Sequence, residues 1–253
     1  MSHIICFAMQ KGGVGKTTTT LNVGVELAQQ GAKVLLIDID PQANLTSGLG
    51  QDPASLKYSI YEVLLNSSKG VEFATVSTSA GVDLVPSTLA LAGAELELAG
   101  KIGREFFLRE ALAAATSYYD YILIDPPPSL GLFTVNALAA ATSVIVPLQA
   151  QAYALQALPQ LEATIGLVKK LNTGLRIGGL VVTMHDKRTA LSPAVERQAR
   201  EQYGELVFNT TIPLTTRLAE APAAGEPISK YAPDSAGAHA YEALAQEVKK
   251  RYA

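Results

Sequence analysis

Short apolar runs alternate along the chain with longer segments in which apolar residues recur every three or four positions. Each run is bounded by polar residues, which is typical of strands buried on both faces of a parallel sheet. Such strands are predicted at residues 4–8, 34–39, 82–86, 121–125, 144–148, 176–183 and 207–212. Helices are predicted at residues 17–30, 58–65, 89–98, 106–115, 154–171 and 238–252. The alternation predicts a single α/β domain over residues 1–253, with a mainly parallel, twisted sheet and helices on both faces.

The first predicted helix has a clear apolar face, because Leu21, Val25 and Ala28 recur at spacings of four and three. Gly24 lies on the same side and would let the helix approach the sheet closely. Gly31 follows the last predicted turn, where glycine commonly ends a helix. Together with the strands before and after it, this helix forms a βαβ unit, whose two strands are expected to be parallel.

Composition narrows the class of protein. The chain has 253 residues, of which 48% are apolar and 17% are charged, enough for one domain with a substantial core. The net charge of −3 provides no global basic field, so any DNA contact must come from a local patch. Cys6 is the single cysteine, which excludes an internal disulfide and a CxxC metal site and fits a reducing compartment. No apolar segment is long enough to span a bilayer, and no signal peptide is expected.

A glycine-rich segment connects the first strand to the first helix. It reads Gln10-Lys11-Gly12-Gly13-Val14-Gly15-Lys16-Thr17-Thr18. A strand, a glycine-rich turn and a helix in this order are typical of a phosphate-binding loop, in which backbone N–H groups face the anion. Lys16 would contact the β- and γ-phosphates, and the Thr17 hydroxyl would bind Mg²⁺. The alternative is a glycine-rich turn that binds no ligand.

Aspartates end two of the predicted strands. Asp38 and Asp40 lie on the same side of the second strand, near its carboxyl end. Asp125 ends the strand at 121–125 and would hold Mg²⁺ through water. Because ligands of open α/β sheets bind at the carboxyl ends of strands, these carboxylates are expected near the phosphates. Alternatively, Asp38 and Asp40 simply form the turn that precedes Pro41.

These motifs resemble those of the ParA/MinD family of ATPases, and the chain is most similar to small, Soj-like ParA partition proteins. Lys11 is the extra lysine of that family's deviant Walker A loop, and Gln10 stands where the general loop pattern has glycine. Asp38-Ile39-Asp40-Pro41-Gln42 and Asp125-Pro126-Pro127-Pro128-Ser129-Leu130-Gly131 match the family in frame. The resemblance covers nearly the whole chain and implies the P-loop NTPase fold, with ATP and Mg²⁺ as cofactors.

The resemblance also implies roles for individual residues. In an ATP-bound sandwich homodimer, Lys11 would reach the nucleotide of the other subunit, and Gln149 and Tyr153 would face that subunit. Lys11 and Lys16 would serve catalysis, while Asp40 would activate the attacking water. Asp38 would help to form the Mg²⁺ shell and to shape its loop. The nucleotide itself would be bound by Lys11, Gly12, Gly13, Val14, Gly15, Lys16, Thr17 and Thr18.

Adenine would be flanked by Met184, Pro213 and Thr215. Here the chain departs from its relatives, which read I-P-R-N-x-R-L, whereas this chain has Ile212-Pro213-Leu214-Thr215-Thr216-Arg217-Leu218. The missing asparagine leaves the contact with the base to Thr215 or to backbone atoms.

Soj-like relatives bind DNA without sequence preference through basic residues near the edge of the dimer. The matching residues are Arg188 and Arg217, and Lys187 and Lys230 are candidates by charge alone. The alternative is a set of ordinary solvated cations. Two departures support this alternative, because Leu214 and Glu226 replace an arginine and a lysine of the family.

The implied function is ATP-dependent DNA segregation by a cytoplasmic, nucleoid-associated protein. The ATP dimer would bind nonspecific double-stranded DNA, and a ParB-like protein would stimulate hydrolysis and release. No N-terminal helix-turn-helix domain is expected, so binding to a specific operator is not expected either.

Two alternatives remain. A related ATPase positions another cargo, such as a microcompartment or a chemoreceptor cluster, through an adaptor. A MinD-like division-site regulator cycles on a membrane. The segment 238–252 has few bulky aliphatic residues and a polar face of mixed charge, so it predicts a helix packed on the sheet and no membrane contact.

Overall fold

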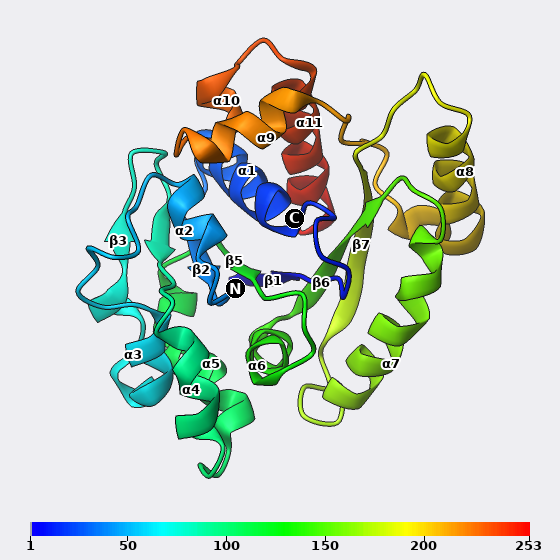
Figure 1. Ribbon diagram of the computed structural model, residues 1–253. Helices are drawn as coiled ribbons and strands as arrows, with labels where there is room; N and C mark the ends of the chain where they lie inside the picture. Colours follow the sequence, from blue (N-terminus) through cyan, green and yellow to red (C-terminus); the bar gives the residue numbers. More distant parts are fainter. Residues whose placement is uncertain (1) are drawn as a thin grey trace.

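The computed structural model describes residues 2–253 and has a central sheet with helices on both faces (Figure 1). The sheet has seven strands in the order β3-β4-β2-β5-β1-β6-β7. Neighbouring strands are parallel except for the edge pair β3 and β4, which is antiparallel. The strands are β1 (His3–Phe7), β2 (Val34–Asp38), β3 (Val76–Ser77), β4 (Asp83–Val85), β5 (Tyr121–Asp125), β6 (Ser143–Gln149) and β7 (Arg176–Thr183). The predicted α/β fold with a mainly parallel sheet is confirmed.

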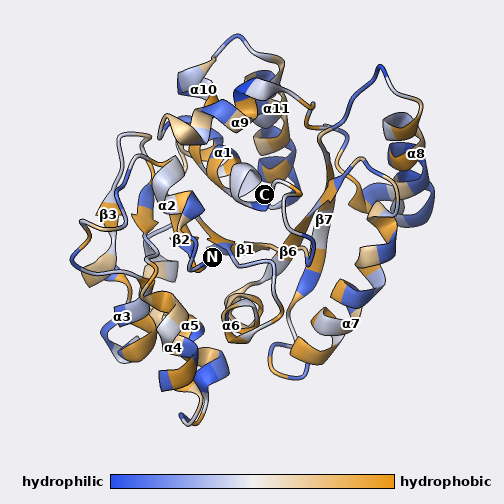
Figure 2. Cartoon of the chain, in the orientation of Figure 1, coloured by the Kyte–Doolittle hydropathy of each residue, from blue (hydrophilic) through white to orange (hydrophobic). Residues whose placement is uncertain are grey.

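Two groups of helices cover the sheet and bury a separate apolar cluster on each face. One face carries α1 (Lys16–Gln29), α2 (Asn44–Gly48), α9 (Thr216–Ala223), α10 (Ile228–Tyr231) and α11 (Ala236–Arg251). The other carries α3 (Ile60–Leu65), α4 (Leu91–Leu98), α5 (Phe107–Ala111), α6 (Leu132–Ala140), α7 (Leu158–Val168) and α8 (Leu191–Tyr203). Figure 2 shows that hydrophobic residues concentrate along the central strands.

Several boundaries differ from the prediction. The predicted helix at 106–115 is shorter, since Phe106 belongs to a 3₁₀ turn and α5 ends at Ala111. The predicted helix at 154–171 begins with a 3₁₀ turn and continues as α7, with a proline in its first turn. Helices α2, α6, α8, α9 and α10 and the edge strand β3 were not predicted. The predicted C-terminal helix is confirmed, and Tyr241, Leu244 and Val248 of α11 are buried.

The prediction of a strand at 207–212 is wrong. This segment runs beside β7 and is joined to it by an isolated bridge between Leu180 and Val207. Side chains satisfy much of its backbone: Glu247 accepts hydrogen bonds from the N–H groups of residues 209 and 210, and Arg200 donates to the carbonyls of residues 208 and 209. The apolar residues of the segment are nevertheless buried, which explains the strand-like pattern in the sequence.

Helix α1 lies unusually close to the sheet because residue 24 is glycine. A Cβ atom at Gly24 would lie 2.5 Å from Cδ2 of Leu36 and 3.3 Å from Cδ1 of Leu123, on two neighbouring strands. The helix ends at Gln29 with Gln30 as its C-cap, and the predicted terminating glycine, Gly31, follows with a φ of 88° that only glycine readily adopts. This close contact fixes the start of α1 relative to the ends of β1, β2 and β5.

Replacing Gly24 with alanine is expected to lower the free energy of unfolding by roughly 1–3 kcal/mol, because the added methyl group overlaps a buried leucine. Urea denaturation measures this. Gly93→Ala in α4 is the matched control, since its added Cβ meets no atom within 4 Å and should stabilise the helix by up to about 1 kcal/mol. Equal stability of Gly24→Ala and the wild type would refute the close packing of α1.

Candidate nucleotide-binding site

The glycine-rich loop lies at the carboxyl end of β1, in the middle of the sheet, and leads directly into α1. Gly13 and Gly15 have φ values of 71° and 88°, so the loop needs glycine at both positions. Gly15 is the N-cap of α1, and no side chain caps this end of the helix. The first N–H groups of α1 are therefore available to an anion, and the helix dipole favours negative charge there.

Lys16 opens α1 and is almost completely buried, with 7% of its surface exposed. Burial lowers its pKa, and the nearby carboxylates of Asp125 and Asp40 partly oppose that shift. A buried ammonium group is stable only with anionic partners, so its position suits a phosphate.

Thr17 and Asp125 form the part of the site that fits a cation. The Thr17 hydroxyl donates a hydrogen bond to Oδ2 of Asp125 at 2.7 Å. The other carboxylate oxygen, Oδ1, is buried and has no hydrogen-bond partner among residues 2–253. Burial raises the pKa of Asp125 to about 8, with a further contribution from the charge of Asp38. A bound cation would remove this penalty, and oxygen atoms are the ligands that Mg²⁺ prefers.

The other ligands of a metal ion would have to come from phosphate and water. Within the described part of the chain, no group of three or more His, Cys, Asp and Glu side chains is arranged to hold a metal. This pattern is usual for Mg²⁺ bound with a nucleotide, because the ion keeps several water ligands. The residues present thus fit Mg²⁺ bound together with phosphates.

Asp38 organises the loop that follows β2. Its Oδ2 accepts hydrogen bonds from the backbone and the hydroxyl of Thr46 at 2.8 Å and 2.7 Å, and its Oδ1 accepts one from Asp40 N at 3.2 Å. Burial raises the pKa of Asp38 to about 7. These contacts fit the expected role in loop geometry, and a role in the Mg²⁺ shell stays a prediction. Sequence reasoning missed Thr46, which no motif singled out.

Asp40 lies in the same turn and is 9% exposed. Its Oδ1 accepts a hydrogen bond from Gln42 N at 3.0 Å, and its carbonyl accepts one from Ala43 N. Asp38 and Asp40 thus also make the contacts expected if they only form the turn that precedes Pro41. The turn continues through Ala43, with a φ of 53°, into α2.

The segment after Asp125 is held from both sides. Thr134 of α6 donates a hydrogen bond to the carbonyl of Ser129 at 2.6 Å. Glu95 of α4 accepts one from Leu132 N at 3.1 Å and so caps a helix whose own N-cap residue is a glycine. These two hydrogen bonds connect the proline-rich segment, residues 126–132, to α4 and α6.

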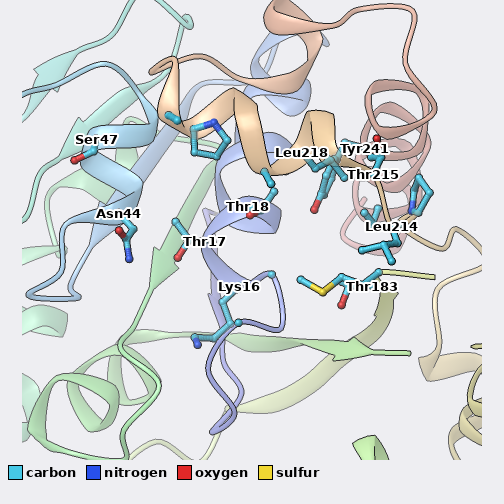
Figure 3. Close-up of a pocket in the computed structure, with 18 residues that line it drawn as sticks. Lys16, Thr17, Thr18, Asn44, Ser47, Thr183, Leu214, Thr215, Leu218 and Tyr241 are labelled. Atoms are coloured by element: carbon cyan, nitrogen blue, oxygen red, sulfur yellow. The ribbon is translucent and has the colours of Figure 1, made fainter. Parts of the chain in front are cut away.

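A cavity of about 560 Å³ extends from the phosphate loop to the segment after β7 (Figure 3). It brings Gly13, Gly15, Lys16, Thr17 and Thr18 together with the predicted base-binding residues Met184, Pro213 and Thr215. Its size suits a nucleotide. The lining also includes residues that the sequence did not indicate, chiefly Asn44, Ser47, Leu218 and Tyr241.

The base end of the cavity is built by two backbone segments. His185 N donates to the carbonyl of Ile212 at 2.9 Å, and Leu214 N donates to the carbonyl of His185 at 3.1 Å. Met184 has a φ of 51°, and its sulfur accepts a hydrogen bond from Gln149 at 3.1 Å. Thr215 is the N-cap of α9.

Three predicted nucleotide residues do not line this cavity. Val14 is buried, and its carbonyl accepts a hydrogen bond from Thr183 at 2.8 Å. Gly12 is exposed, as is Lys11, whose Nζ lies 3.4 Å from Oε1 of Gln151. Tyr153 is also exposed and has a φ of 63°. Lys11 and Tyr153 are thus available at the surface.

The predicted DNA-binding cations lie outside the cavity. Arg188 precedes α8, Arg217 lies on α9 and Lys230 on α10, elements along the upper edge of the molecule in Figure 1. Lys187 is exposed beside Arg188. Within residues 2–253, no helix combines the length and apolar character required to cross a membrane.

Comparison with known proteins gives consistent matches. A family model described as an AAA domain matches residues 2–177. The sporulation initiation inhibitor protein Soj of Bacillus subtilis is 48% identical over 249 residues, which cover 98% of this chain and 98% of Soj. The chromosome partitioning protein ParA of Myxococcus xanthus is 45% identical, over 99% of this chain and 89% of ParA. The solved structure of cobyrinic acid a,c-diamide synthase from Mycobacterium smegmatis, with an ATP analog and magnesium, has a TM-score of 0.87 at 38% identity, and covers 100% of this chain and 96% of that one.

Asp125→Asn is expected to raise the Mg²⁺ concentration needed for nucleotide binding roughly 10–100-fold, the usual cost of losing a group that supports a metal. Titrating Mg²⁺ against a fluorescent ATP analog measures this. Asp120→Asn is the control, because Asp120 lies just before β5, away from its carboxyl end, and bonds to Lys33 N. An unchanged Mg²⁺ requirement for Asp125→Asn would remove Asp125 from the site.

Proposed function

Since the chain belongs to the family of Soj and ParA chromosome-partitioning ATPases, we propose that it couples the hydrolysis of Mg-ATP to reversible dimerisation and DNA binding. It is an ATPase that uses ATP and Mg²⁺, like the related proteins seen with ATP analog and magnesium. The observation that carries the proposal is the Thr17–Asp125 pair beside the buried Lys16, at the mouth of a cavity large enough for a nucleotide.

Each nucleotide-site residue has a proposed task. The N–H groups at the start of α1 and the Lys16 ammonium group bind and orient the phosphates. Thr17 and Asp125 hold Mg²⁺, which neutralises charge on the phosphates when bound. Asp38 keeps the loop after β2 in place, and Asp40 orients the attacking water. Such a site works mainly by positioning and by electrostatic stabilisation, so Asp40 need not be a strong base.

Lys11 connects the nucleotide to dimerisation. Its side chain is exposed and outside the cavity of its own chain, which supports a role toward a second subunit. Gln149 and Tyr153 belong to the same face in this proposal. Two Lys11 side chains, one from each subunit, then stabilise the phosphates only when ATP joins the two subunits.

The DNA-binding surface is proposed to consist of Lys187, Arg188, Arg217 and Lys230. The ATP dimer presents two copies of this surface to nonspecific double-stranded DNA, so the protein associates with the nucleoid. A ParB-like partner stimulates hydrolysis, and the released monomers leave the DNA. The cargo is a chromosome or plasmid, and another assembly is the alternative. Membrane cycling is disfavoured because the apolar face of α11 is buried in the protein.

Lys11→Ala should bind Mg-ATP with little change but lose ATP-dependent dimerisation, because the residue lies outside the cavity of its own subunit. Light scattering during size-exclusion chromatography with and without ATP reports the dimer. Lys69→Ala, an exposed lysine on another surface, is the control. A normal ATP dimer of Lys11→Ala would contradict the proposed crossing of Lys11.

The double variant Arg188→Glu and Arg217→Glu should still form the ATP dimer yet bind duplex DNA at least tenfold more weakly (about 1.4 kcal/mol or more). The reason is that two phosphate contacts per subunit become repulsive. Anisotropy of labelled DNA at two salt concentrations, with ATP or ADP, is the measurement. Lys69→Glu with Arg109→Glu has the same change in charge elsewhere and serves as the control. Equal loss in both variants would mean that net charge, and not this surface, governs binding.

A further inference from the structure

Three of the four cations of the proposed DNA surface are already paired with carboxylates of the same chain. Arg188 forms two hydrogen bonds of 2.9 Å with Asp186. Arg217 lies 3.2 Å from Glu220, and Lys230 lies 2.9 Å from Glu226. Lys187 has no such ion pair within residues 2–253.

Each pair is formed by residues close together in the sequence. Asp186 precedes Arg188 by two residues in the turn before α8, Glu220 is one helical turn after Arg217 on α9, and Glu226 precedes Lys230 by four residues at the start of α10. Local pairs of this kind depend on local backbone conformation. They therefore form without any contact to a second subunit.

The pairing makes the surface almost neutral. The three cations and three carboxylates cancel in formal charge, so only Lys187 contributes a net positive charge to each subunit. The chain as a whole is negative, with a formal net charge of −3. A DNA phosphate must therefore compete with a carboxylate for each of the three paired cations.

We propose that Asp186, Glu220 and Glu226 are negative determinants of DNA binding, which compete with phosphate and hold the affinity of a single subunit too low for stable binding. The inference rests on the proposed function, because it concerns the same surface. A dimer presents two of these nearly neutral surfaces to one DNA molecule, and the two together bind DNA where a single surface does not. The carboxylates thereby make DNA binding dependent on ATP.

Salt dependence distinguishes competition from the opposite role, in which the carboxylates orient the arginines for phosphate. A free cation that binds phosphate releases a condensed counterion, which contributes about −0.9 to the slope of log K against log salt. The carboxylate that a cation leaves stays beside the DNA, so the pair adds no net positive charge next to the phosphates and displaces few condensed counterions. The wild type should therefore have a shallow slope for a protein with four cations per subunit.

The test is a triple variant, Asp186→Asn, Glu220→Gln and Glu226→Gln, which removes the charges and keeps the size of the side chains. Its matched control is Asp120→Asn, Glu97→Gln and Glu110→Gln, with the same change in net charge on other parts of the surface. Anisotropy of labelled duplex DNA is measured over a series of salt concentrations, with ATP and with ADP. Asp186→Asn alone is included in case the triple variant is unstable.

The expected result is a gain in affinity of roughly threefold for each pair removed, measured against the control variant. The salt slope should steepen by about 0.9 per pair and subunit, and binding should become measurable with ADP. Equal or lower affinity, or parallel salt slopes, would overturn the inference.

The Arg188→Glu and Arg217→Glu variant separates this failure from failure of the proposed function. If that variant loses DNA binding while the triple variant matches its control, the DNA surface stands and only the competition is wrong. If neither the wild type nor the triple variant binds DNA at any salt concentration, both the surface and the competition are wrong.

Discussion

The structure depends on burying like charges together at the carboxyl ends of two neighbouring strands. Asp38 of β2 and Asp125 of β5 are paired in register and are both almost fully buried. Burial raises the pKa of each carboxyl group, and the charge of Asp38 raises that of Asp125 further. Three hydrogen bonds stabilise the Asp38 carboxylate, whereas Oδ1 of Asp125 has no hydrogen-bond partner among residues 2–253. The unsatisfied charge is therefore concentrated at one position, beside Thr17, where a cation can remove it.

The arrangement of strands brings this charge to the phosphate loop. Strand β1 lies next to β5, which lies next to β2, so three chain segments that are distant in sequence end at the same edge of the sheet. Gly24 lets α1 pack against β2 and β5, and this contact places Lys16 and Thr17 near the aspartates. The free N–H groups at the start of α1 lie in the same part of the molecule, because Lys16 and Thr17 are the first residues of that helix. Fold stability and nucleotide binding thus share one set of contacts.

The ion pairs at the surface differ from these buried contacts. The ion pairs of Arg188, Arg217 and Lys230 are local and exposed, and contribute little to stability. Their main effect is on the electrostatic potential of this surface, where each carboxylate offsets the charge of one cation. The segment after Asp125 is instead tied to α4 and α6 by hydrogen bonds to Glu95 and Thr134.

The sequence by itself determined the sheet, the phosphate loop and the strand-end aspartates, because buried parallel strands and glycine-rich turns have strong local patterns. It did not reveal the true state of residues 207–212, since burial gives the same apolar pattern whether a segment bonds only to a strand or, as here, partly to β7 and partly to Glu247 and Arg200. Tyr241 was also hidden, because it reaches the site from α11, 222 positions beyond its partner Thr19. Thr46 is only eight residues from Asp38, but the short helix α2 that carries it has no clear sequence pattern. The tertiary structure alone decided that the Thr17 hydroxyl bonds directly to Asp125, because the two residues are 108 positions apart and meet only through the order of the strands.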